Sequence, residues 1–154
     1  MNPDVELLIL DPRLLEWGLP AYQSDMAAAV DLHACIDAPL TIPAQSPAIL
    51  IPAGFAIHMA SHDLAAIILP RSGAGHKRGL VLGNTAGLID GDYTGPIFVS
   101  AWNRSAPGTT PIEIVPGERI AQMMFVPVVR ATLRVVAAFS QASARGGGGF
   151  GSTG

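Results

Sequence analysis

Residues 69–103 hold the densest group of side chains able to do chemistry. The first loop of this stretch places three of the nine cationic residues of the chain among glycines: Arg71, Lys77 and Arg78. A second glycine-bounded loop carries Asp90 and Asp92. Guanidinium groups and the backbone N–H groups of a glycine-rich loop bind phosphate, and a carboxylate held opposite can take a proton from water. The stretch therefore predicts phosphate chemistry.

Length and composition limit what can position these side chains. A chain of 154 residues suits one domain. Only 14 % of the residues are charged and the mean hydropathy is +0.40, yet no apolar run approaches the roughly 18 residues typical of a spanning helix. We therefore predict no membrane segment. The excess apolar surface predicts burial between copies of the chain, as in a homo-oligomer.

Charge and cysteine content exclude further classes. The net charge of −3 gives no general basic field, so we predict no nucleic-acid partner. The N-terminal run VELLIL is short and acidic and follows no basic leader, which predicts a cytoplasmic protein. The single cysteine, Cys35, excludes an intramolecular disulfide, and its apolar surroundings predict a buried, inert thiol.

The pattern of apolar residues predicts about ten short strands. Prolines at 39, 43, 47 and 52 disfavour helices and favour short strands and turns between 37 and 59. The other predicted strands are 5–10, 27–35, 65–69, 81–82, 88–89, 96–102, 112–115, 120–129 and 133–137. We expect a connecting loop at 13–22, one helical turn within 72–78 and a hairpin tip at 91–95. The predicted fold class is all-β, a barrel or sandwich.

The end of the chain differs from the rest. Its last residues, SARGGGGFGSTG, are too poor in apolar side chains to pack a core. We therefore divide the chain into one β domain at 1–140 and a flexible glycine-rich arm at 141–154.

Five stretches, in order, resemble the motifs of the trimeric deoxyuridine triphosphatases. They are AAAVDLHA at 27–34, PRSG at 70–73, GLIDGDYTG at 87–95, GERIAQMMF at 117–125 and RGGGGFGSTG at 145–154. Each motif is weak by itself, but five in order are specific. The chain departs from the family pattern at Ala29 and Gly147, where glycine and an acidic residue are usual.

The resemblance, which is to the bacterial branch, implies both fold and reaction. It implies a jelly-roll-like β-barrel and a homotrimer whose three active sites are shared between subunits. The implied reaction is Mg²⁺-dependent hydrolysis of dUTP to dUMP and pyrophosphate by water attack at the α-phosphorus. This reaction limits uracil incorporation into DNA and supplies dUMP for thymidylate synthesis.

The resemblance also implies roles for single residues. Asp90 is the expected general base, with a plain turn aspartate as the alternative, and Asp31 is expected to hold Mg²⁺ through ordered water while the phosphates ligate the ion directly. The residues expected to bind the phosphates are Arg71, Ser72, Gly73 and Gln122, together with Arg145 of the arm. The residues expected to bind the base and sugar are Asn84, Leu88, Ile89, Tyr93 and Phe98, with Phe150 of the arm closing over uracil.

Three other cationic residues stay outside this set. Arg119 is interpreted as a structural contact to a carboxylate such as Asp92, and Lys77 and Arg78 are interpreted as solvated loop charges.

Two rival functions remain open. A dCTP deaminase has the same fold but needs a glutamate near the base, and the candidates Glu113 and Glu118 lie outside the motif loops. A trimer that senses nucleotides without catalysis is the second rival, and the presence of Asp90, Arg71 and the glycine-rich tail disfavours it.

Overall fold

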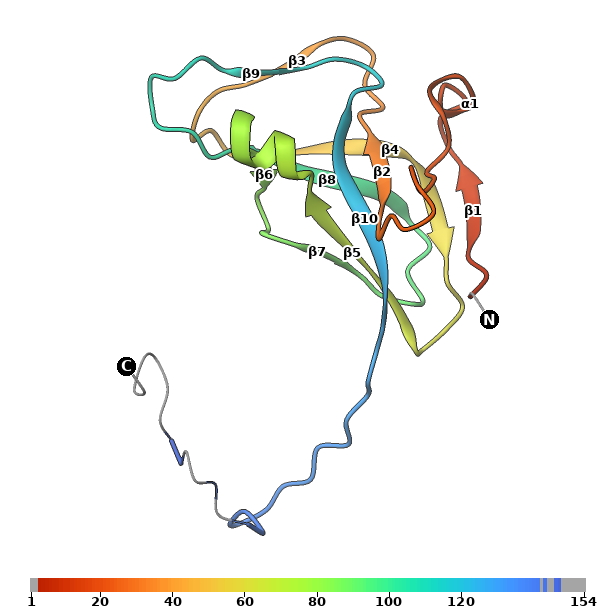
Figure 1. Cartoon of the computed structure of the whole chain (residues 1–154), viewed down its shortest axis with the longest axis vertical. Coiled ribbons are helices and arrows are strands. Elements are labelled where there is room, and N and C mark those ends of the chain that lie inside the picture. The colour runs from red at the N-terminus through yellow and green to blue at the C-terminus, as the bar shows by residue number, and fades with distance from the viewer. Residues whose placement is uncertain (1–2, 142, 144–145, 148–154) are drawn as a thin grey trace.

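The computed structural model describes residues 3–141, 143 and 146–147 (Figure 1). Within these residues the helical and strand elements follow one another in this order: β1 (Glu6–Ile9), α1 (Leu14–Trp17), β2 (Val30–His33), β3 (Leu40–Ile42), β4 (Ile49–His58), β5 (Leu64–Pro70), η1 (Ala74–Arg78), β6 (Leu80–Leu82), β7 (Gly87–Ile89), β8 (Pro96–Asn103), β9 (Ile112–Ile114) and β10 (Arg119–Pro127).

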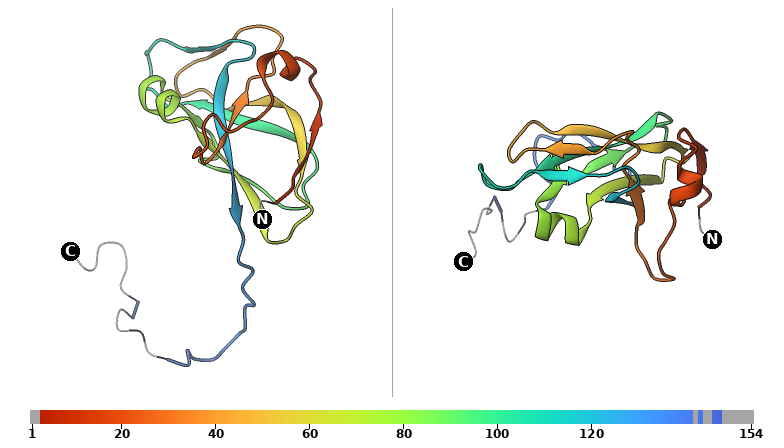
Figure 2. Two further views of the ribbon diagram at one scale, coloured as in Figure 1. Left: turned by 45° about the vertical axis from the view of Figure 1, so that its right-hand side comes forward. Right: turned by 90° about the horizontal axis from the view of Figure 1, so that it is seen from above.

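Two antiparallel sheets form the body of the domain (Figures 1 and 2). One four-stranded sheet has the order β1-β4-β8-β6, and the other has the order β2-β10-β5-β7. A separate pair, β3 with β9, lies at one end. The predicted all-β class is confirmed, and the arrangement is jelly-roll-like because strands distant in the sequence, such as β2 and β10, pair within each of the two sheets.

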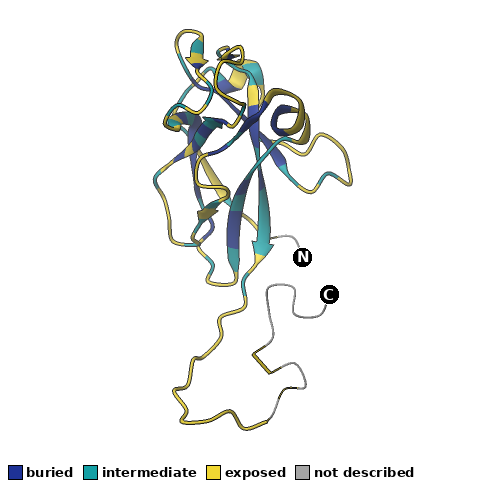
Figure 3. Cartoon of the chain, turned by 90° about the vertical axis from the view of Figure 1, so that its left-hand side faces the viewer, coloured by how far each residue is buried: buried dark blue, intermediate teal, exposed yellow. Residues whose placement is uncertain are grey.

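The core lies between the two sheets (Figure 3). Along β8, inward residues alternate with outward ones, so that Ile97, Val99 and Ala101 are buried while Phe98 is not. This period of two is what a strand with one covered face requires. Leu14 of α1 is fully buried in the same apolar cluster.

Cys35 also lies in this core, and burial raises the pKa of its thiol to about 11. The predicted inert thiol is confirmed. In the part of the chain that the structure describes, none of the helices has the length and apolar character to span a membrane.

Three element predictions need correction. The loop predicted at 13–22 contains α1, a single turn in which the Arg13 guanidinium lies 5.2 Å from the centre of the Trp17 ring. The predicted strand at 27–35 shortens to β2. The predicted strand at 133–137 is wrong for the single chain, because those residues have no strand beside them to pair with.

Residues beyond β10 run clear of both sheets (Figure 1). The Val128 N–H still donates to the Asp63 carbonyl at 2.9 Å. After it the chain exposes large apolar side chains, among them Leu133 and Phe139 at 93 % and 91 %. The division at residue 140 stays a prediction.

Phe55 tests the core. It is 1 % exposed, so Phe55→Ala should lower the free energy of unfolding by about 3–5 kcal/mol through lost contacts and a cavity. Met26→Ala is the control, because Met26 is 95 % exposed and its loss should cost less than about 0.5 kcal/mol. Urea unfolding at fixed protein concentration measures both. Equal losses in the two variants would contradict the assigned core.

Candidate functional site

A buried carboxylate joins three of the motifs. The Asp31 side chain on β2 is 11 % exposed and accepts from two arginines. Its Oδ1 accepts from Arg71 Nε at 2.8 Å, and its Oδ2 accepts from Arg119 Nη1 at 3.0 Å. Arg71 Nη1 also donates to the Arg119 carbonyl at 3.4 Å. Two guanidinium groups therefore meet on one aspartate.

Strand β10 brings these segments together because it pairs with both β2 and β5. Gln122 lies opposite Asp31 on one side and opposite Leu69 on the other. Its Nε2 donates to the Pro70 carbonyl at 2.9 Å, which fixes the start of the Arg71 loop. Asp31, Arg71 and Gln122, predicted from separate motifs, thus lie at one end of one sheet.

A register shift in β10 explains how Arg119 joins the group. The pairing with β2 is irregular between Arg119 and Ala121, so Arg119 rather than Ile120 lies opposite His33. Side chains of a strand alternate between faces, and one extra residue changes the face that follows. The shift places Arg119 on the face of Asp31 and leaves Ile120 in the core.

The interpretations of two arginines need correction. Arg119 contacts a carboxylate, as predicted, but this carboxylate is Asp31 and not Asp92. Arg78 is not a solvated charge: it forms an ion pair with Glu118, and its Nη2 donates to the Glu113 carbonyl at 2.7 Å. These partners lie 35 to 88 residues away in the sequence, so no local spacing could have signalled them.

Ser72 and Gly73 follow Arg71 and are exposed. Added to Gly73, a Cβ would meet no atom within 4 Å, so the backbone here is open to a ligand. Lys77 is also exposed, in agreement with its interpretation as a solvated charge.

The residues predicted to bind the base and sugar come from the segment that runs from the end of β6 through β7 into β8. Leu88, Tyr93 and Phe98 are 66 %, 40 % and 42 % exposed. Tyr93 Oη donates to the Pro96 carbonyl at 2.9 Å. This bond folds the ring against Gly95, where an added Cβ would lie 2.6 Å from that hydroxyl. The ring is therefore held in one place beside the loop.

The remaining predicted residues of this group are Asn84, which is exposed, and Ile89, which is half-buried in β7. Arg145 and Phe150 lie outside the described residues.

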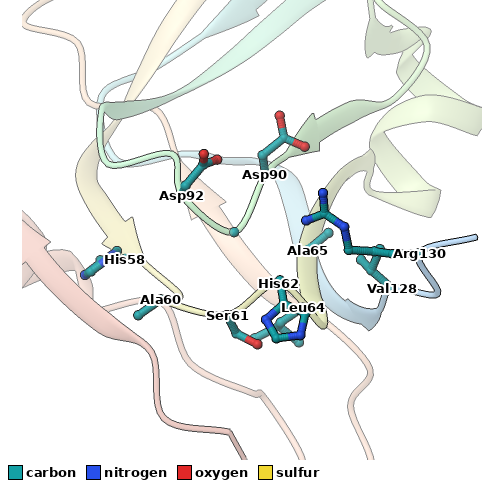
Figure 4. Close-up of a pocket in the computed structure, with 11 residues that line it drawn as sticks. His58, Ala60, Ser61, His62, Leu64, Ala65, Asp90, Asp92, Val128 and Arg130 are labelled. Atoms are coloured by element: carbon teal, nitrogen blue, oxygen red, sulfur yellow. The ribbon is translucent and has the colours of Figure 1, made fainter. Parts of the chain in front are cut away.

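Asp90 and Asp92 follow β7 and border a cavity of about 620 Å³. Figure 4 shows the two aspartates on one side of the cavity and Ser61 and His62 on the other. Between the aspartates, Gly91 packs so closely on the Ser61 carbonyl that an added Cβ would lie 2.0 Å from it. This close approach requires glycine and fixes the loop that carries Asp90.

Within one chain, Asp90 and Asp31 do not meet. On β5, Ala66 pairs with Ile89, the residue before Asp90, whereas Leu69 pairs with Gln122, which in turn pairs with Asp31. Strand spacing and residue rise therefore separate Asp90 from Asp31 by roughly 19 Å across the sheet. The predicted site residues of one chain therefore lie in two separate groups, one around Asp31 and one around Asp90.

His33 lies beside the arginine cluster. Its Nδ1 is buried and has no hydrogen-bond partner among the described residues. Burial lowers the pKa of His33, the charges of Arg119 and Arg71 lower it further, and Asp31 opposes them. These surroundings therefore favour the neutral form of the imidazole next to two cations.

Fold and site together define a class: an all-β, jelly-roll-like protein in which two arginines meet on one nearly buried aspartate. The family model "dUTPase" matches residues 16–154. The chain is 54 % identical over 151 residues to the deoxyuridine 5'-triphosphate nucleotidohydrolase of Paraburkholderia phymatum, covering 97 % of both chains. It is 56 % identical over 154 residues to the enzyme of the same name from Leptothrix cholodnii, covering 100 % of this chain and 99 % of the relative. The chain therefore belongs to the dUTPase family.

Solved structures agree on the fold. A Staphylococcus bacteriophage 80alpha dUTPase mutant with dUpNHpp superposes with a TM-score of 0.86 at 21 % identity, covering 99 % of each chain. A mutant dUTPase of phage phi11 of S. aureus, described with a structural Mg(II) ion, superposes with a TM-score of 0.76 at 18 % identity, covering 90 % of this chain and 99 % of that one. At these identities the likeness concerns the fold.

His33 gives a prediction for stability against pH. Its pKa is lower folded than unfolded, so below about pH 6.5 the unfolded chain binds the extra proton and the folded state loses stability. The free energy of unfolding should therefore fall as the pH drops from about 7.5 to 5.5. His33→Leu should remove the contribution of His33 to this dependence of the unfolding free energy on pH. His62→Gln, which replaces an exposed histidine, should leave the dependence unchanged. Urea midpoints across the pH series measure it, and an unchanged slope in His33→Leu would refute the assignment.

Proposed function

We propose that this chain hydrolyses dUTP to dUMP and pyrophosphate, with water attacking the α-phosphorus. One observation carries the proposal. Relatives that are 54 % and 56 % identical over at least 97 % of this chain are named deoxyuridine 5'-triphosphate nucleotidohydrolases. The geometry supports it, because motifs distant in the sequence converge on Asp31, which accepts from the guanidinium groups of Arg71 and Arg119, and exposed Ser72 and Gly73 follow Arg71.

Phosphate binding belongs to the Asp31 end. Arg71 uses Nε for Asp31 and Nη1 for the Arg119 carbonyl; its Nη2, together with Ser72 and the backbone of Gly73, is proposed to bind phosphate. Bidentate guanidinium contacts and backbone N–H groups suit phosphate oxygens. Gln122, fixed at Pro70, borders the same loop. Negative charge that develops on the leaving pyrophosphate is stabilised there.

Asp31 is the residue that would hold Mg²⁺. The described residues contain no group of three or more His, Cys, Asp or Glu side chains that could hold a metal ion. A single carboxylate fits Mg²⁺, because this ion keeps bound water and takes most other ligands from substrate phosphates. When bound, Mg²⁺ would neutralise phosphate charge.

Asp90 is the proposed general base. A carboxylate held by a rigid loop can accept a proton from water within hydrogen-bonding reach. The contact of Gly91 with Ser61 supplies that rigidity. The attack needs no covalent intermediate, since water adds as pyrophosphate leaves.

Selection of the base and the sugar is assigned to β7, β8 and the loop between them. Tyr93, tied to Pro96, is proposed to lie against the deoxyribose and exclude a 2′-hydroxyl. The backbone of Leu88, Ile89 and Phe98, with Asn84, is proposed to line the uracil slot. A slot of this kind discriminates because a wrong base leaves buried polar groups unpaired.

The working unit is proposed to be a homotrimer with shared sites. The separation of Asp90 from Asp31 in one chain supports this, as does the apolar surface of the segment after β10. The arm, with Arg145 for the γ-phosphate and Phe150 for uracil, is proposed to close the site and exclude water.

The deaminase alternative is weakened by the contacts of Glu118. One carboxylate oxygen accepts from Arg78 and the other accepts from the Val115 N–H. A glutamate used in this way is not free to move protons on a base. Release of ammonia from dCTP would decide for the deaminase.

A substrate panel tests the function. Pyrophosphate release should be fast with dUTP and Mg²⁺, and slow with dCTP, dTTP or UTP. Asp90→Asn should lower kcat at least about a hundredfold while KM for dUTP changes by less than about threefold, because only the proton acceptor is lost. Wild-type protein that binds dUTP without releasing pyrophosphate would support the sensing alternative. Full turnover by Asp90→Asn would remove its role.

If each active site takes Asp31 and Asp90 from different chains, two inactive variants should complement each other in one trimer. Chains with Asp90→Asn and chains with Asp31→Ala should each be inactive alone. Hybrid trimers, made by co-expression, should regain up to about a quarter of wild-type activity, because some sites then take Asp90 from one chain and Asp31 from another. Hybrids that stay inactive while remaining trimeric would show that both residues act within one chain.

A further inference from the structure

A second ion pair connects the glycine-rich loop at 71–79 to the turn that precedes Arg119 of β10. Arg78, the last residue of η1, pairs with Glu118 and donates to the Glu113 carbonyl at 2.7 Å. Arg71 precedes η1, and its Nη1 donates to the Arg119 carbonyl at 3.4 Å. Arg71 and Arg78, at the two ends of the η1 segment, are therefore held by consecutive residues. Arg71 contacts Arg119 at the start of β10, and Arg78 contacts Glu118 in the turn before β10.

Glu118 is held on several sides. Its Oε2 accepts from the Val115 N–H at 3.1 Å, and its own N–H donates to the Val115 carbonyl at 3.1 Å. Its carbonyl accepts from the Ala34 N–H at 2.8 Å, three residues after Asp31. Because Glu118 is fixed relative to β2 and β10, its ion pair fixes Arg78 of η1 relative to the same two strands.

The η1 segment depends on such outside contacts. It is one five-residue π-helical turn, and π-helical turns are rare, short and frequently found at functional sites. Arg104 donates from Nε and Nη2 to the Gly75 carbonyl at 3.3 and 3.1 Å. Gly79 ends the turn at φ 74°. External hydrogen bonds, rather than a long helix, therefore define where the loop lies.

We propose that Arg78 and Glu118 are positioning residues for phosphate binding: they set how Arg71 and Arg119 are placed on either side of Asp31. This rests on the proposed function. Neither residue is assigned a substrate contact. Their side chains are 42 % and 20 % exposed, so water at the Arg78 side chain screens the ion pair and limits its contribution to the free energy of unfolding. The pair should therefore affect turnover more than stability.

Kinetics test the proposal. Arg78→Gln and Glu118→Gln should each lower kcat for dUTP about tenfold to a hundredfold, as expected when a reacting group is misplaced. The amide of Glu118→Gln still accepts from Val115, so this variant removes the ion pair alone. The double variant should lose no more than the stronger single variant, because the pair acts as a unit. Arg78→Lys should recover part of kcat. Thermal midpoints should stay within a few degrees of the wild type.

Lys77→Gln is the matched control, since Lys77 is an exposed neighbour on the same turn. It should keep wild-type kcat. The proposal is overturned if Arg78→Gln stays within twofold of wild type, if Lys77→Gln loses as much, or if the effects of the two single variants multiply in the double variant.

A second readout does not require activity. The Arg71 Nε–H, bonded to Asp31 at 2.8 Å, gives an NMR signal that Arg71→Lys identifies. Its hydrogen exchange should accelerate at least about fivefold in Arg78→Gln and stay unchanged in Lys77→Gln. Unchanged exchange in Arg78→Gln overturns the positioning role. A wild-type protein that releases no pyrophosphate from dUTP would instead refute the proposed function, and the exchange experiment would still decide the role of the pair.

Discussion

The site depends on one negative charge placed where water hardly reaches it. Asp31 is nearly buried, and an isolated carboxylate in that position would be costly. Arg71 and Arg119 remove that cost by donating to both of its oxygens. In return, Asp31 holds two cations that would otherwise repel each other. One aspartate therefore fixes the relative position of three segments that are far apart in the sequence.

Backbone geometry makes this convergence possible. The register shift at the start of β10 turns Arg119 to the face of Asp31, and the close contact of Gly91 with Ser61 fixes the opposite end of the same sheet. The sheet is stiff, so the two ends cannot approach each other within a chain. A reaction that needs both must bring them from different copies, which also gives a use for the exposed apolar surface after β10.

The sequence predicts the strands well wherever one face is covered, because alternation is then enforced along the chain, as in β8. It fails at 133–137, an apolar run for which the single chain offers no partner strand. The contacts of Arg78 and Arg119 could not be predicted, because they follow from strand register and from a one-residue shift. The convergence of Asp31, Arg71 and Gln122 was predicted only through family motifs, and nothing local in the sequence places them together.

A carboxylate at the centre of a phosphate site needs its own explanation. Asp31 neutralises part of the charge of Arg71 and Arg119, so the free chain presents less positive charge than two arginines would suggest. A bare triphosphate would also be repelled by Asp31. A triphosphate carrying Mg²⁺ has less negative charge and brings a cation that the carboxylate can attract through water. Under the proposed function, Asp31 would therefore serve the Mg²⁺ complex of the nucleotide through ordered water and would also hold the two arginines of the site.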